Sequence, residues 1–67
     1  MSKYEELVKF FEKFGDSREK AEEEAKKVLD LVGANPSDED LMRVANSVFG
    51  VMNRGLDLYA MLKRIFR

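Results

Sequence analysis

Hydrophobic residues recur along the chain at spacings of three and four positions, which is the period of an amphipathic helix. In the first segment five of them share one helical face: Tyr4, Leu7, Val8, Phe11 and Phe14. This face predicts a helix over residues 2–14. Gly15 suits the left-handed residue that follows a helix, and Asp16 with Glu19 has the spacing of a capping box that begins the next helix.

The second helix is predicted over residues 17–32, with a polar outer face rich in Glu and Lys. Its inner face holds Ala21, Ala25, Val28, Leu29 and Val32. Gly33 is expected to close this helix. Ser37 then suits the N-cap of a third helix, because acidic residues 38–40 follow it and complement the positive end of the helix dipole.

Beyond residue 40 the pattern fits two arrangements. Apolar residues keep a heptad spacing from Leu41 to Ile65, and one continuous helix over 38–66 would present them as a seam. The protein would then have three helices. A homodimer would be expected, because the seam would lack partners within its own chain.

We favour a break in the chain at residues 54–57. Gly55 suits the left-handed residue after a helix, and Asp57 suits the N-cap of another. The third and fourth helices then cover 38–54 and 58–66, and Gly55 has a positive φ angle.

The predicted fold class is therefore all-α. Its preferred form is a compact bundle of four short helices around one core, over 2–14, 17–32, 38–54 and 58–66. The whole chain, 1–67, is assigned to a single domain and is expected to be monomeric. With no Cys and no His, neither a disulfide nor a structural zinc ion can support so small a domain, so helix packing must stabilise it.

The sequence predicts neither a membrane span nor a targeting signal. The longest uninterrupted apolar run, 59–62, is four residues long, far short of the roughly 20 that cross a bilayer. Charged residues stand near Met1, where a signal peptide needs its apolar stretch. A cytoplasmic or recombinant setting is therefore expected.

Catalysis is not expected from these residues. General acid-base and nucleophilic mechanisms most often use His or Cys, and the sequence has neither. The acids at 22–24 and 38–40 are consecutive, so a helix directs them about 100° apart and away from a common metal ion. Gly50 and Gly55 match the glycine spacing of a phosphate loop, but Leu56 and Asp57 replace its lysine and hydroxyl residue. No cofactor is predicted.

Charge is shared unevenly between the two parts of the chain. Residues 1–40 carry seven basic and twelve acidic side chains, whereas residues 41–67 carry five basic and one acidic. A basic patch in the second part is a candidate nucleic-acid surface, formed by Arg43, Arg54, Lys63, Arg64 and Arg67. The net charge of −1 opposes steering toward phosphate, so nucleic-acid binding is not expected and a structural role is favoured.

Four apolar residues at the edges of the helical faces form a candidate partner surface: Phe10, Leu31, Met42 and Phe49. Core filling is the favoured explanation for them, because a thin core needs every large side chain. A small helical protein-binding module is therefore the alternative function, and no partner is required by the sequence.

The sequence resembles computationally designed helical proteins. The Glu- and Lys-rich stretch 17–27, the explicit cap signals at Gly15–Asp16, Pro36–Ser37 and Gly55–Asp57, and the absence of His, Cys, Trp, Gln and Thr carry this resemblance. Gly50 and the looser segment 46–53 depart from it, as a redesigned natural backbone would. The resemblance implies a designed or redesigned fold without a ligand and with no biochemical activity.

Overall fold

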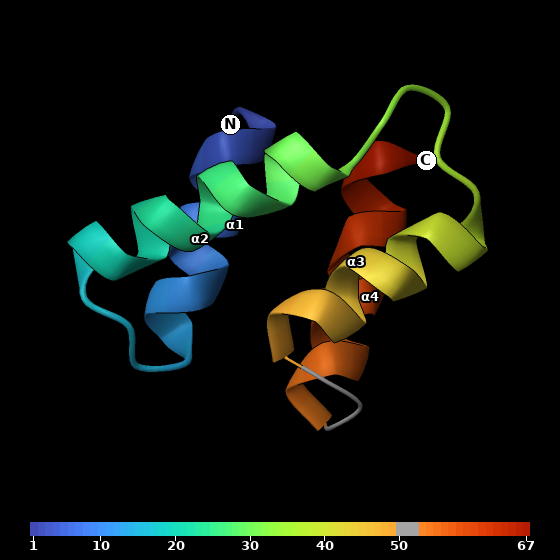
Figure 1. The fold of residues 1–67 in the computed structure, drawn as a ribbon. Helices are drawn as coiled ribbons and strands as arrows, with labels where there is room; N and C mark the ends of the chain where they lie inside the picture. Colours follow the sequence, from blue (N-terminus) through green and yellow to red (C-terminus); the bar gives the residue numbers. More distant parts are fainter. Residues whose placement is uncertain (50–52) are drawn as a thin grey trace. The chain divides into compact units, whose positions relative to one another are not determined.

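The computed structural model describes residues 1–49 and 53–67, and within them the chain forms four α-helices (Figure 1). Their bounds are α1 Lys3–Lys13, α2 Arg18–Leu31, α3 Asp38–Phe49 and α4 Asn53–Phe66. The all-α class and the four helices are confirmed. The chain divides into two compact units, Met1–Asp30 and Leu31–Arg67, each described by itself. One domain around one core stays a prediction.

At both ends of α1, hydrogen bonds between residues close in sequence satisfy backbone groups that the helix itself leaves without partners. The Ser2 hydroxyl accepts from the backbone N–H of Glu5 at 3.1 Å, so Ser2 is the N-cap. At the other end Gly15 has a φ angle of 101° and donates its N–H to the carbonyl of Glu12, while Asp16 donates to Phe11. This pair of bonds is a Schellman motif, and it confirms the left-handed turn predicted at Gly15.

The predicted capping box of Asp16 and Glu19 is wrong. The N-cap of α2 is Ser17, whose hydroxyl accepts from the backbone N–H of Lys20 at 3.1 Å. A capping box needs the N–H of Asp16 as the donor to the Glu19 side chain. The Schellman motif at the end of α1 already uses this N–H in its bond to Phe11. The next helix therefore begins one residue later than the box predicts.

The link between α2 and α3 ends in the cap that the sequence predicts. Gly33 does not have a positive φ angle, and the left-handed residue of this link is Asn35, at 52°. Ser37 and Asp40 form a reciprocal capping box: the Ser37 hydroxyl accepts from the Asp40 N–H at 3.1 Å, and the Asp40 carboxylate accepts from the Ser37 N–H at 3.0 Å. The start of α3 at Asp38 is thus fixed.

The predicted break at residues 54–57 is wrong, and so is the continuous helix over 38–66. The third helix ends at Phe49 and the fourth begins at Asn53, so Gly55 occupies a helical position and Asp57 lies inside a helix. The prediction that Gly50 lies within the third helix concerns a residue outside the described ranges.

Packing explains why Gly55 is helical. It lies three and seven residues before Leu58 and Leu62, and all three residues are buried on one face of α4. The buried stripe of α4 therefore extends to its first turn. Because α3 and α4 pack against each other, this stripe has a partner within its own chain.

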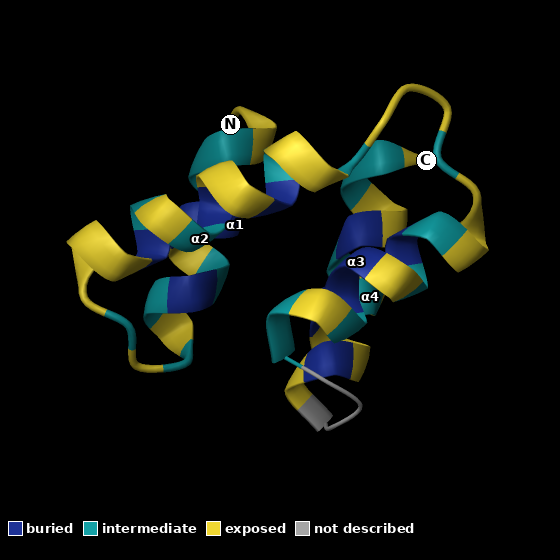
Figure 2. Cartoon of the chain, in the orientation of Figure 1, coloured by how far each residue is buried: buried dark blue, intermediate teal, exposed yellow. Residues whose placement is uncertain are grey.

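The interior of both units is apolar. Figure 2 shows the buried positions as stripes along the helices, with exposed residues on the opposite sides. The buried hydrophobic residues are Leu7, Val8, Phe11, Ala21, Ala25, Val28, Leu41, Val44, Ala45, Leu58 and Leu62. The three-and-four spacing of apolar residues in the sequence predicts these stripes. Their burial removes apolar surface from water, which is the main favourable contribution to folding.

The conformation of Gly15 generates a direct test. Gly15→Ala is expected to lower the free energy of unfolding by about 1–2 kcal/mol, because a Cβ is strained at a φ angle of 101° even where space is open. Urea unfolding followed by circular dichroism measures the change. Gly33→Ala is the matched control, since a Cβ there also meets nothing within 4 Å and the φ angle is not positive. An equal loss in both variants would contradict the cap.

Candidate functional site

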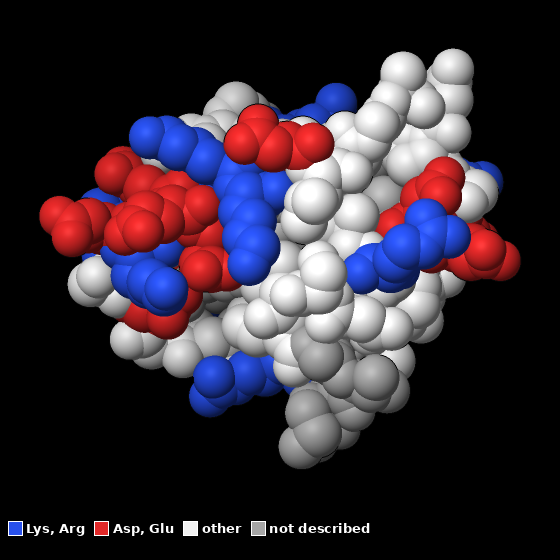
Figure 3. All heavy atoms as spheres, viewed as in Figure 1, with Lys and Arg blue, Asp and Glu red and all other residues white. Residues whose placement is uncertain are grey.

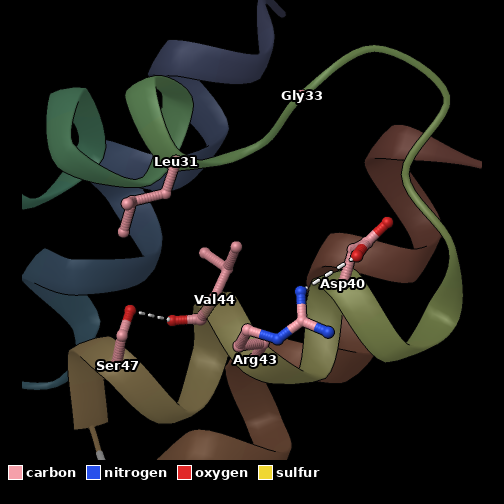
Figure 4. A pocket seen from close by; sticks show the side chains of 6 residues that line it. All are labelled: Leu31, Gly33, Asp40, Arg43, Val44 and Ser47. Atoms are coloured by element: carbon pink, nitrogen blue, oxygen red, sulfur yellow. Dashed lines mark hydrogen bonds and ion pairs between the residues drawn. The ribbon is translucent and has the colours of Figure 1, made fainter.

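The Leu31–Arg67 unit carries a surface pocket of about 390 Å³. Figure 4 shows the Leu31 and Val44 side chains reaching into it, and Arg43 and Asp40 joined at its rim. Gly33 and Ser47 complete the lining, and the Ser47 hydroxyl donates to the Val44 carbonyl at 2.8 Å. The pocket therefore offers apolar surface beside an ion pair.

Local hydrogen bonds occupy the charged groups at this rim. Arg43 donates to Asp40 Oδ1 at 3.0 Å and to Glu39 Oε1 at 3.2 Å, which are ordinary ion pairs within one helix. The pKa of Asp40 lies below its ordinary 3.8. The largest cause is the hydrogen bond from the Ser37 backbone, and the Ser37 side chain and Arg43 contribute further hydrogen bonds. The Asp40 carboxylate is thus held in its charged form as part of the α3 cap.

The residues of the candidate partner surface belong to different units and to different faces of the helices. Leu31 lines the pocket and is 48% exposed. Met42 and Phe49 are half-buried and seven positions apart, so they share one side of α3. Val44 projects from a different side of that helix, because two positions turn it by about 200°. Phe10 belongs to the other unit. The centre of its ring lies 5.4 Å from the centre of the Phe11 ring and 4.9 Å from that of the Phe14 ring.

The residues of the candidate basic patch are exposed but do not share one helical face. Arg54 and Lys63 are nine positions apart on α4, which places them about 180° apart around its axis. The Lys63 ammonium lies 4.8 Å from the centre of the Tyr59 ring. Arg64 is exposed in the last turn of α4, where a cation complements the helix dipole.

Acids of α3 pair with the two remaining arginines of that set. Arg67 binds Asp38, which joins the end of α4 to the start of α3. Arg43 binds Glu39 and Asp40, as described above. Figure 3 shows blue and red spheres interleaved over α1 and α2 and meeting again over the start of α3. Over these elements, side chains of opposite charge lie next to one another.

One charged cluster lies outside the candidate sets of the sequence analysis. Arg18, at the start of α2, lies 3.1 Å from Glu22, 3.1 Å from Glu5 and 3.6 Å from Glu12. The hydrogen bond to Glu22 and the nearby charges of Glu5 and Glu12 raise the pKa of Arg18. Glu5 and Glu12 are seven residues apart, and this spacing, which sets both on one face of α1, is the signal that could have indicated the cluster.

Neither a metal-binding group of acids nor a membrane-spanning helix occurs in the part of the chain that the structure describes. Comparison of the chain with models of known protein families, with curated proteins and with solved structures finds no match. Function is therefore inferred from the geometry of the residues themselves.

The capping box makes the stability of the protein depend on pH. The pKa of Asp40 is lower in the folded state, so its contribution to stability is present above pH 3.8 and is lost as the pH falls through the folded value. Asp40→Asn is therefore expected to destabilise the protein at neutral pH and to have less effect in acid. Urea unfolding at a series of pH values measures this difference.

Asp57→Asn is the control for that experiment, because Asp57 is an exposed acid inside α4 and away from the cap. It should change stability little at any pH. A difference between Asp40→Asn and the parent that stays constant from neutral to acid pH would contradict the assignment.

Proposed function

We propose that the chain is a designed or redesigned helical fold that reaches its structure without a ligand and carries no catalytic activity. The main support for this proposal is that its charged side chains form helix caps and ion pairs within their own units. Ser37 and Asp40 close the start of α3, Arg43 pairs with acids one turn away, and Arg18 pairs with three acids of its own unit. These groups serve local helix stability, as explicit cap and charge design does.

The distribution of polarity also supports a structural role. Among the described residues no polar or charged side chain is buried, and no buried side-chain nitrogen or oxygen lacks a hydrogen-bond partner. Catalytic groups usually need burial or close like charges to shift their pKa. The acids that pair with Arg18, Arg43 and Arg67 instead keep more than a third of their side-chain surface exposed and are each beside a cation, which favours a fold whose polar surface keeps it in solution. A monomer that needs no cofactor is part of this proposal.

A small protein-binding module is the second candidate function. The pocket beside Leu31 and Val44 favours it, because it combines an apolar base with a charged rim, as binding surfaces do. A nucleic-acid role has less support, because acids of α3 neutralise Arg43 and Arg67.

The proposal of a ligand-free fold predicts that stability does not depend on metal. Thermal unfolding followed by circular dichroism should give the same Tm with and without EDTA, because packing and local hydrogen bonds are proposed to supply the stability. A Tm that falls by several degrees when EDTA is added would show that a bound metal contributes to folding.

Nucleic acid should bind weakly. In a fluorescence titration of a labelled DNA duplex at about 0.15 M salt, the Kd is expected to exceed roughly 1 µM, because the net charge of −1 opposes attraction to phosphate and acids of α3 pair with Arg43 and Arg67. Arg54→Gln together with Lys63→Gln should leave this weak binding nearly unchanged. A sub-micromolar Kd that these two changes abolish would favour the nucleic-acid role instead.

The second candidate is tested with peptides selected from a helical library against the folded protein. Leu31→Lys is expected to weaken their binding at least tenfold, because it removes apolar surface from the pocket. Leu56→Lys is the matched control, since Leu56 is 57% exposed on α4 and does not line this pocket. Peptides that bind both variants as tightly as the parent, or a selection that yields none, would exclude a binding role for the pocket.

A further inference from the structure

We draw no further inference here: the strongest candidate, the pocket lined by Leu31 and Val44 on the Leu31–Arg67 unit, belongs to the site already described, and nothing in the structure shows what covers its apolar surface.

Discussion

The hydrogen bonds at the helix ends are the interactions on which the rest of this structure depends. Every helix leaves its first N–H groups and last carbonyl groups without partners inside the helix, and short helices have a large share of such groups. Here serine hydroxyls accept at the starts of α1, α2 and α3, and the Gly15 turn closes the end of α1. These bonds fix where α1, α2 and α3 begin, and so fix which of their residues face the interior.

The same constraint explains the distribution of charge. Asp40 accepts from the N–H of Ser37 and so belongs to the α3 cap, and Arg43 then pairs with Asp40. Arg67 at the end of α4 pairs with Asp38 at the start of α3, where each charge also complements the dipole of its own helix. Exposed pairs of this kind each contribute little to stability, so their effect comes from the sum of many small local contributions. A surface used in this way suits a protein whose role is structural.

Local chemistry also decides which parts of the fold the sequence could predict. Gly15 and Ser37 stand where a cap signal and the end of a hydrophobic stripe coincide, and both predictions are confirmed. Gly55 has the same local signal, but it also lies in register with Leu58 and Leu62, and burial on that face outweighs the cap. The pocket itself is not predicted from the sequence, although Leu31 and Arg43 each belong to a candidate set. Asp40, Arg43, Val44 and Ser47 follow the three-and-four spacing of one face of α3, whereas the path of the link adds Leu31 and Gly33, which periodicity does not show.

The most direct test is backbone NMR of the protein in the absence of any ligand, since the central claim is that helix ends and packing alone set the fold. Secondary chemical shifts should be helical within α1, α2, α3 and α4, with Gly55 and Asp57 helical and Gly15 in the left-handed conformation. A spectrum that becomes ordered only when a ligand is added, or a left-handed Gly55, would contradict the account.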